Sequence, residues 1–338
     1  MSRKRNKIGI IFCGGSGLQT AGGRVVEVRK KEEMAEWLKE VPELGIIAEP
    51  DPYFVFGGDA SEITPRVWSQ LVKKISEVYS SVDGIVITHG LDTILYTGAM
   101  LSFMLQNLSK PIVLTGSPLF REMQSSEELE GLVADYRNLG VRANLINAFQ
   151  VATMDIAEVV IAYGNRVLRA NQTVKSIHPT INYFDDFADG LLGKVDFGIK
   201  LFPHAAKRAK GKLRVEDKIG EGLATFRIDP LTRPESFGAL LSSGCKAVLV
   251  RSYSANLFPD SFTSYLRLAY GKGVPVIAYN LNVAEKTKIR EEYIVVNSMT
   301  YEATMAKSLW VLGKTTKPAK FRELLAKDIA HELRSQSV

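Results

Sequence analysis

The sequence predicts an α/β protein, with a doubly wound, mostly parallel sheet followed by a smaller C-terminal α/β domain. Its 338 residues match the length of two ordinary domains. Through the first half, short apolar runs alternate with amphipathic stretches of helical period, which favours parallel strands joined by crossover helices. Near residues 203–222 the pattern gives way to charge and glycine, and a shorter alternation then resumes. We therefore expect one domain over residues 1–205 and another over residues 206–338.

The expected elements follow this alternation in chain order. In the first domain we expect strands at 7–12, 53–56, 84–88 and 111–116, helices at 33–41, 66–80 and 93–108, a long helix within 125–153, and a strand–turn–strand unit at 158–170. In the second domain we expect strands within 245–253 and 275–280 and helices at 260–273 and 300–314. Each strand is a short apolar run, whereas each helix repeats its apolar residues at helical spacing.

The composition is that of a soluble globular protein, with 46% hydrophobic and 24% charged residues. No run approaches the ~18 apolar residues that a membrane span needs. The start, MSRKRNKIGIIF, has a basic head, but its apolar stretch is short and leads into Cys13 and two glycines without a small-residue cleavage site. We expect a cytoplasmic protein with no membrane partner.

The residues present disfavour metal, cofactor and nucleic-acid binding. Cys13 and Cys245 are the only cysteines, too few for a disulfide framework or a structural zinc site, and the four histidines show no metal-ligand spacing. The net charge of +6 is concentrated at the termini and in residues 204–214. That segment has no interleaved aromatic residues, so we interpret it as a solvated linker. We expect no metal, no cofactor and no nucleic acid.

Ligands of such sheets bind at the carboxyl ends of the strands, where loops from neighbouring strands converge. The first of these loops is CGGSG, residues 13–17, whose glycines allow a sharp turn with exposed amide N–H groups that could hold an anion or an oxyanion. The candidate nucleophiles in it are Ser16 and Cys13. At a strand end without a flanking histidine we expect Cys13 to be a small buried hydrophobe and chemically inert.

The loop after residues 53–56 carries a second group of polar residues. Thr64, which precedes Pro65, predicts the N-cap of the helix at 66–80, so a structural role is favoured for it. Asp59 and Ser61 lie at the strand end itself and could bind an amino group or a hydroxyl.

Six segments in the same order resemble the asparaginase/glutaminase family. IIFCGGSGL is similar to the family's first signature, which ends in Thr-Gly-Gly-Thr, and GIVITHGLDTI is similar to its second, with the core His-Gly-Thr-Asp-Thr. DASEITPRVW, VLTGSP, YGNRVLRANQTVK and VLVRSYSANLFP resemble further family segments. The resemblance covers residues 7 to about 313 and implies the fold of cytoplasmic bacterial-type L-asparaginases, with a homodimer or homotetramer as the assembly.

The resemblance implies roles for individual residues. Ser16 stands at the position of the nucleophile, Asp92 at the signature aspartate and Lys175 at the catalytic lysine. The expected substrate is a small-molecule amide or amino acid. The residues expected to line or bind it are Gly15, Asp59, Ala60, Leu91, Ser117 and Asn256.

Several positions depart from the family pattern. Leu91 occupies the position of the second catalytic threonine, Ala60 that of a substrate-binding serine, and Ser254 that of a glycine ahead of Asn256. Leu91 cannot donate a proton or position water, and losing such a group typically costs roughly a hundredfold to ten-thousandfold in rate.

Two functions therefore compete. The first is an amidohydrolase that uses Ser16 to hydrolyse L-asparagine or a related, less polar amide to the acid and ammonia. The second is a family member without catalysis that binds or senses a small molecule. Retention of Ser16, Asp92 and Lys175 together favours the enzyme.

Overall fold

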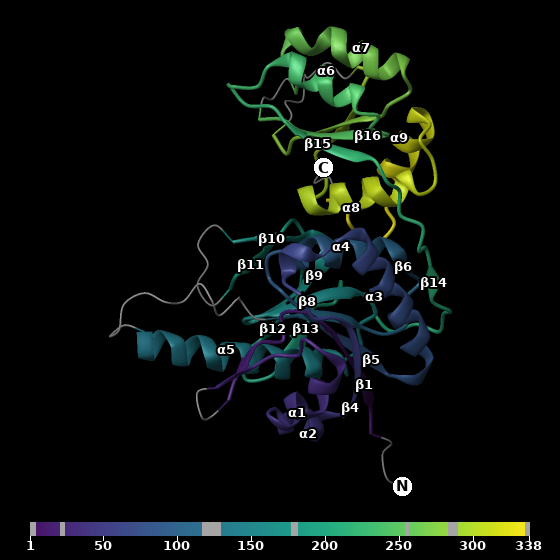
Figure 1. Cartoon of the computed structure of the whole chain (residues 1–338). Coiled ribbons are helices and arrows are strands. Elements are labelled where there is room, and N and C mark those ends of the chain that lie inside the picture. Colours follow the sequence, from purple (N-terminus) through teal and green to yellow (C-terminus); the bar gives the residue numbers. More distant parts are fainter. Residues whose placement is uncertain are drawn as a thin grey trace. The chain divides into compact units, whose positions relative to one another are not determined.

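The computed structural model describes residues 5–20, 24–116, 130–176, 182–253, 257–282 and 290–334 (Figure 1). For Gln19 and residues 130–139 only the backbone course is described. The chain divides into two compact units, Met1–Asp217 and Lys218–Val338. In the described part of the chain, no helix combines the length and apolar character needed to cross a membrane.

The first unit is built on an eight-stranded sheet in the order β13-β12-β9-β8-β7-β5-β1-β4. Adjacent strands from β4 to β8 pair in parallel, and β8, β9, β12 and β13 pair antiparallel. The predicted doubly wound, mostly parallel sheet is confirmed, with antiparallel strands added at one edge. The strands are β1 (Lys7–Cys13), β4 (Glu49–Phe56), β5 (Gly84–His89), β7 (Ile112–Thr115), β8 (Val159–Tyr163), β9 (Arg166–Arg169), β12 (Leu191–Val195) and β13 (Ile199–Leu201).

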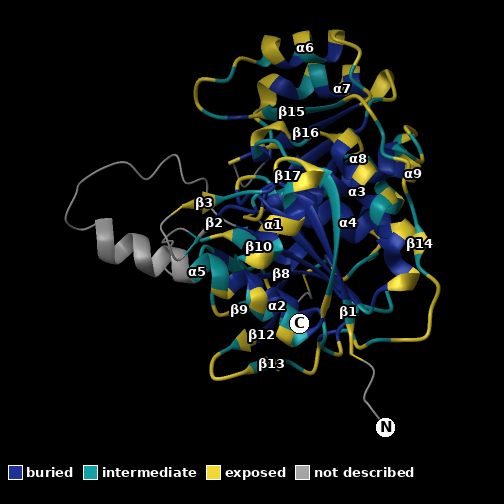
Figure 2. Ribbon diagram, turned by 60° about the horizontal axis from the view of Figure 1, so that its bottom comes forward, coloured by how far each residue is buried: buried dark blue, intermediate teal, exposed yellow. Residues whose placement is uncertain are grey.

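Helices cover both faces of this sheet. On one face Phe12 and Val113 of the strands share a core with Trp37 and Phe149. On the other face the ring of His89 hydrogen-bonds the hydroxyl of Thr97 in α4. The sheet and α4 form the buried centre of the unit, dark blue in Figure 2. The helices of the first face are α1 (Met34–Lys39), α2 (Pro42–Ile47) and α5 (Glu130–Val151), and those of the second are α3 (Pro65–Val78) and α4 (Ile94–Met104).

Strand β4 closes one edge of the sheet and begins earlier than the expected residues 53–56. Pro50 and Pro52 lie within it and pair in register with β1. Because the two prolines are two residues apart, both of their nitrogens lie on the same side of the strand. Proline is tolerated in a strand when that side is the unpaired edge of the sheet. The missing N–H groups also make this edge a poor template for another strand.

Short elements complete the first unit. The helix expected at 93–108 ends at Met104 because the next two residues form a strand that pairs with β14. The additional strand pairs are β2 (Leu18–Gln19) with β3 (Val25–Val26), β10 (Thr173–Lys175) with β11 (Phe184–Asp186), and β6 (Leu105–Gln106) with β14 (Arg214–Val215). Among the described residues, the 3-10 turns of the first unit are η1 (Lys31–Glu33), η2 (Ala60–Glu62), η3 (Tyr79–Ser81) and η5 (Ala170–Gln172), and the second unit contains η6 (Asp260–Phe262).

The expected linker at 204–214 belongs to the first unit and is not simply solvated. The half-buried guanidinium of Arg208 donates to the backbone carbonyls of Asp83, Ala152 and Met154. Ala206 N–H also donates to the buried carboxylate of Glu158. These bonds tie residues 206 and 208 to the first unit, which extends to Asp217.

The second unit has a four-stranded parallel sheet between helices. Phe237 and Phe262 pack on one face of the sheet with Val248. A fully buried ion pair, Lys307 with Glu332, joins α8 to the chain that follows α9. The strands are β15 (Leu223–Arg227), β16 (Ala247–Arg251), β17 (Val276–Tyr279) and β18 (Ile294–Val296), and the helices are α6 (Pro234–Ser242), α7 (Thr263–Gly271), α8 (Tyr301–Leu312) and α9 (Pro318–Ala326).

Candidate active site

The loops after β1, β5 and β7 meet backbone to backbone at the carboxyl edge of the large sheet. Gly15 has a φ of +56°, and a Cβ on it would lie 2.1 Å from the carbonyl carbon of His89. A Cβ on Gly116 would lie 1.7 Å from the His89 oxygen. Only glycine fits either position, because any side chain would collide with the backbone of His89. The contact brings the predicted nucleophile loop against the turn that contains Leu91 and Asp92.

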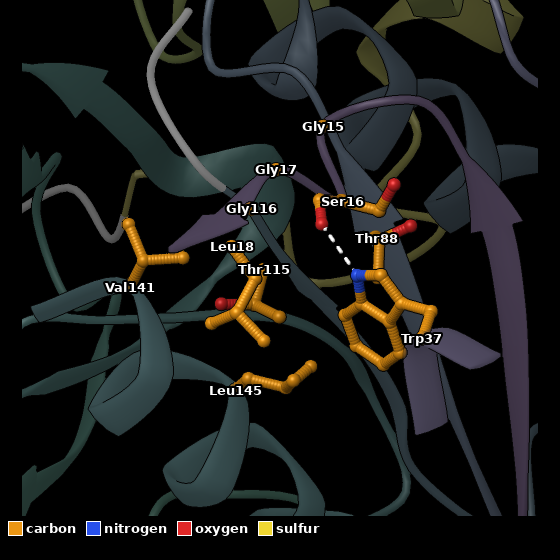
Figure 3. Close-up of a pocket in the computed structure, with 10 residues that line it drawn as sticks. All are labelled: Gly15, Ser16, Gly17, Leu18, Trp37, Thr88, Thr115, Gly116, Val141 and Leu145. Atoms are coloured by element: carbon orange, nitrogen blue, oxygen red, sulfur yellow. Dashed lines mark hydrogen bonds between the residues drawn. The ribbon is translucent and has the colours of Figure 1, made fainter. Parts of the chain in front are cut away.

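Ser16 is held in place by two hydrogen bonds. Its hydroxyl oxygen accepts from the backbone N–H of Val28 at 2.9 Å. Its carbonyl oxygen accepts from the indole N–H of Trp37 at 2.7 Å, the bond dashed in Figure 3. The residue is only 3% exposed. Among the described residues, neither Asp92 nor Lys175 hydrogen-bonds its hydroxyl. Ser16 therefore lies on the loop after β1, and its hydroxyl is engaged by the segment that follows β3.

The remaining groups of the first loop are less available for chemistry. Cys13 is buried, and burial raises the pKa of its thiol to about 12. A thiol with so high a pKa remains protonated at neutral pH and is a poor nucleophile. The backbone N–H of Gly14 donates to the Phe56 carbonyl at 2.9 Å, so this amide of the turn is not a free oxyanion donor.

A buried hydrogen-bond chain fixes the turn after β5. Because the Gly90 carbonyl can only accept, His89 must carry its proton on Nδ1, which lies 2.8 Å from that oxygen. The other ring nitrogen, Nε2, then accepts from the Thr97 hydroxyl at 2.8 Å, and Trp68 donates to the same hydroxyl oxygen at 2.9 Å. Burial lowers the pKa of His89 from 6.5 to about 4. The histidine of the THGLDT segment is thus neutral and holds the backbone ahead of Leu91.

Leu91 and Ala60 are both buried, at 4% and 6% exposure. The two loops that carry them are tied together by the Thr93 hydroxyl, which donates to the Ala60 carbonyl at 2.9 Å. Ala60 also packs directly on Gly90, where an added Cβ would lie 2.5 Å from the alanine methyl. The Ala60 methyl therefore packs against the turn that leads to Leu91.

The Asp59 carboxylate caps a turn in the structure. Its Oδ1 accepts from both the backbone N–H and the hydroxyl of Ser61, at 2.8 and 2.7 Å, which caps the 3-10 turn η2. Thr64 occupies the expected N-cap position of α3, ahead of Pro65, although its side chain makes no capping hydrogen bond.

Asp92 and Lys175 form an ion pair, with 3.8 Å between Oδ1 and Nζ. The two side chains come from the turn after β5 and from β10, and they are 56% and 49% exposed. About half of each side chain is therefore open to solvent. The ammonium of Lys175 also lies 5.8 Å from the centre of the Tyr183 ring, a cation–π distance that helps to orient it.

A buried ion pair supports the segment that carries Lys175. The guanidinium of Arg169 donates to both carboxylate oxygens of Glu158, at 2.6 and 3.2 Å, with both side chains below 8% exposure. The Arg169 carbonyl in turn accepts from the Thr173 hydroxyl at 2.8 Å. Because two parallel donors match a carboxylate, this pair fixes the start of β10 rigidly.

The expected site residues fall into three groups. Gly15, Ser16, Ala60, Leu91 and Asp92 lie on loops in contact, and Lys175 reaches Asp92. Asp59 caps a turn. Ser117 and Asn256, and likewise Ser254, lie outside the described residues, so their roles stay predictions.

Four site residues were not identified from the sequence: Trp37, Val28, Gly116 and Tyr183. Gly116 ends the strand predicted at 111–116, and a glycine at a strand end is a signal that the sequence does offer. The other three are brought to the site by tertiary contacts, for which the sequence offers no local signal.

The fold and the loops define a two-unit α/β protein with an aspartate–lysine pair and a serine loop at the carboxyl edge of a parallel sheet. A family model described as "Asparaginase, N-terminal" matches residues 7–207. L-asparaginase 1 of Escherichia coli (strain K12) is 30% identical over 295 aligned positions, which cover 81% of this chain and 82% of that protein. The chain belongs to the asparaginase family, as its motifs predict, and is an asparaginase-type amidohydrolase by class.

Other relatives extend the comparison. One subunit of the glutamyl-tRNA(Gln) amidotransferase of Pyrococcus abyssi is 26% identical over 354 aligned positions, covering 97% of this chain and 76% of that protein. A crystal structure of L-asparaginase I from Vibrio cholerae superposes with a TM-score of 0.78 over 97% of this chain and 99% of that one, at 24% identity. That likeness confirms the two-domain asparaginase-like fold.

Proposed function

We propose that this protein hydrolyses the side-chain amide of L-asparagine or a related compound to the acid and ammonia. The observation that carries the proposal is the Asp92–Lys175 ion pair, which stands at the sheet edge where the Ser16 loop contacts the turn before Asp92. Such a pair can hold the charged groups of an amino acid and can move a proton. An oxygen nucleophile, a base and an acid partner are the parts that amide hydrolysis through a covalent intermediate requires.

In the proposed reaction, Ser16 Oγ attacks the amide carbonyl carbon and loses its proton to the Asp92 carboxylate. The Lys175 ammonium, paired with Asp92, holds that carboxylate in place. That proton then passes to the leaving nitrogen, the C–N bond breaks, and ammonia departs from an ester on Ser16. Water attacks the ester, the carboxylic acid leaves, and the proton returns to Ser16.

The reaction requires one rearrangement of the structure. The Ser16 hydroxyl must leave the backbone N–H of Val28, which now donates to it at 2.9 Å, before it can face a substrate carbonyl. Losing this single bond costs about 1 kcal/mol, a typical net value for one intramolecular hydrogen bond. The substrate is expected to replace the lost contact.

Leu91 and Ala60 bear on the choice of substrate. Both are apolar where hydroxyl groups are expected in the family, so an amide with fewer polar groups than asparagine is the favoured substrate. Some relatives are named as part of a glutamyl-tRNA(Gln) amidotransferase, so glutamine belongs among the candidates.

The test is a panel of amides incubated with the purified protein while ammonia release is followed. We expect at least one amide to be hydrolysed. Ser16→Ala should abolish turnover, and Lys175→Met should lower it by roughly a hundredfold to ten-thousandfold. Lys200→Met, which removes an exposed lysine of the same unit, is the control and should leave the rate unchanged. Absence of ammonia from every amide, or full activity of Ser16→Ala, would refute the proposal.

A second candidate is a small-molecule-binding or regulatory protein without catalysis. It is favoured by the Ser16 hydroxyl, which is buried and already bonded, and by the missing hydroxyls at Leu91 and Ala60. Under this alternative, amides raise the melting temperature by mass action but release no ammonia. Thermal shift and ammonia assays on the same compounds therefore separate the two functions.

We also propose a homodimer or homotetramer located in the cytoplasm. Both proposals follow from the resemblance to cytoplasmic bacterial-type asparaginases. Light scattering coupled to gel filtration tests the assembly directly, and a monomer at micromolar concentration would contradict it.

A further inference from the structure

The second unit has an open hollow of about 740 Å³. Small-molecule sites usually occupy roughly 300–1,000 Å³, so the hollow is large enough for a ligand. Three segments line it: the end of α7 with Tyr270, the residues ahead of β18 with Arg290 and Glu291, and α9 with Arg322. All three belong to the same compact unit, so one folded body forms the hollow.

The guanidinium of Arg322 is fixed in direction by the backbone. Its Nη2 donates to the carbonyl oxygens of Glu291 at 3.1 Å and of Tyr293 at 3.0 Å. These bonds join α9 to the chain that enters β18. Both bonds use the same nitrogen, and the described residues provide no acceptor for Nε and Nη1. Arg322 is therefore held in place while it keeps N–H donors for a ligand.

Arg290 presents a second guanidinium beside the first. It directly precedes Glu291, whose carbonyl Arg322 binds, so the two arginines meet at the same stretch of chain. Arg290 Nη1 donates to the Thr263 hydroxyl at 3.2 Å, and Nη2 lies 4.0 Å from the exposed carboxylate of Asp260. An ion pair so exposed contributes little. Arg290 is thus oriented by a neutral hydroxyl, and its charge remains available to an anion.

The charges that line the hollow favour a negative ligand. Arg290 and Arg322 stand in its described lining with one acidic residue, Glu291. An adjoining hollow, which shares Arg290 and Glu291, adds one cation, Arg267, and one carboxylate, Glu292. The excess of positive charge is therefore the same in both.

An aromatic ring and two small apolar residues complete the lining. Tyr270 is 47% exposed, and Pro318 and Ala319 line the hollow with it. The Tyr270 hydroxyl donates to the Glu291 carboxylate at 3.4 Å, which helps to fix the ring. An exposed aromatic ring offers a flat surface on which another ring can stack.

We propose that this hollow binds a small organic anion that carries a flat ring. The phosphate or carboxylate group of the ligand lies between Arg290 and Arg322, because guanidinium donors match two oxygens of such a group at once. Its ring lies against Tyr270. The inference does not rest on the proposed amide hydrolysis, because the hollow belongs to the second unit and the residues proposed for hydrolysis belong to the first.

The first test is isothermal titration of the full chain with four probes: AMP, indole-3-acetate, inorganic phosphate and adenosine. We expect AMP or indole-3-acetate to bind with a Kd below about 1 mM, and at least roughly tenfold more tightly than phosphate or adenosine, because only a ring-bearing anion uses both parts of the hollow. Tighter binding of AMP identifies the ligand class as organic phosphates, and tighter binding of indole-3-acetate identifies it as organic carboxylates.

The proposal is overturned if neither ring-bearing anion binds below about 1 mM, or if phosphate or adenosine alone binds within tenfold of the better one.

The second test places the bound anion in the hollow. Arg290→Gln removes one guanidinium without breaking a bond to the backbone, and should weaken binding of the better probe at least roughly tenfold. Tyr270→Leu keeps an apolar side chain but removes the ring, and should weaken it roughly two- to tenfold. Arg322 is less informative, because its loss also releases the carbonyls of Glu291 and Tyr293.

Arg233→Gln is the matched control. It removes the same charge from an exposed arginine of the same unit that is not among the described lining of the hollow, and should bind the probe like the wild type. Melting temperatures of all the variants, measured without ligand, show that each is folded. If Arg290→Gln retains the affinity of the wild type, or if Arg233→Gln loses as much affinity as Arg290→Gln, the anion does not bind in this hollow and the proposal is wrong.

Discussion

The indole N–H of Trp37 donates a 2.7 Å hydrogen bond to the backbone carbonyl of Ser16, and both residues are only 3% exposed. The Trp37 ring also packs edge-on against Phe12, with 5.0 Å between ring centres. Phe12 belongs to the strand that ends at the Ser16 loop. Helix α1 is thus connected to the candidate nucleophile through both a hydrogen bond and the strand that precedes it.

Trp37→Phe should therefore weaken both stability and turnover. The substitution keeps an aromatic ring but leaves the buried Ser16 carbonyl without its donor, at an expected cost of roughly 1–3 kcal/mol in unfolding free energy. Because the loop loses a fixed point, kcat for a hydrolysed amide should fall more than KM changes. Urea unfolding and steady-state kinetics measure the two effects.

Tyr79→Phe is the control for this prediction. It removes a buried hydroxyl that accepts from the backbone N–H of Ser109 at 2.8 Å, ahead of the start of β7 and away from the site loops. If the two variants lower kcat equally at equal stability, Trp37 has no special role in positioning Ser16.

His89 should make the protein sensitive to acid. Its folded-state pKa of about 4 lies below the ordinary value of 6.5, so the unfolded chain binds a proton more readily between these values. The contribution of His89 to the free energy of unfolding is fully present above pH 6.5. It is lost as the pH falls toward 4, by up to roughly 3 kcal/mol. Urea unfolding at several pH values measures the slope.

His89→Gln should flatten this part of the pH profile, whereas His204→Gln, at an exposed position, should retain the wild-type slope. An unchanged profile in His89→Gln would show that carboxyl groups alone cause the acid sensitivity.

Cys13 should resist alkylation in the native state. Burial raises the pKa of its thiol to about 12, so the reactive thiolate is scarce at neutral pH and the reagent has no access. We expect iodoacetamide to label Cys13 only after unfolding, as measured by peptide mass, and Cys13→Ser to retain activity. Rapid stoichiometric labelling with loss of activity would instead identify Cys13 as the nucleophile.

The parallel part of the large sheet could be predicted because its strands are continuous apolar runs bounded by glycine. β12 and β13 carry no such run: Lys194 and Lys200 alternate with their apolar residues at the sheet edge. The start of β4 could not be predicted because it contains Pro50 and Pro52, and proline normally argues against a strand.

The site shows the same division between local and tertiary information. Ser16, Asp92 and Lys175 could be proposed because they stand in recognisable motifs at strand ends. The bond from Val28 to the Ser16 hydroxyl could not, since it depends on how residues 24–28 return to the loop. Nor does the sequence reveal that the Asp92–Lys175 pair is half exposed, because exposure depends on the packing of several loops.

The leucine of THGLDT leads to the last prediction. If the protein is an amidohydrolase limited by its missing hydroxyls, Leu91→Thr combined with Ala60→Ser should raise ammonia release from L-asparagine, by up to roughly a hundredfold. Both positions are buried between loops that Thr93 ties together, so the new hydroxyls would be held close to Asp92. Ammonia release and thermal stabilisation by asparagine are measured together.

Leu91→Val combined with Ala60→Ser separates the hydroxyl from the change of shape, because valine has the branched outline of threonine without its oxygen. If this control matches the threonine variant, space and not hydrogen bonding limits the reaction. If instead the apolar side chains are suited to another ligand, the threonine variant should leave asparagine hydrolysis near zero and weaken stabilisation by that ligand. Adding Ser16→Ala to the threonine variant should abolish any ammonia release gained through Leu91→Thr, because in the proposed reaction Ser16 makes the attack that the restored hydroxyl assists.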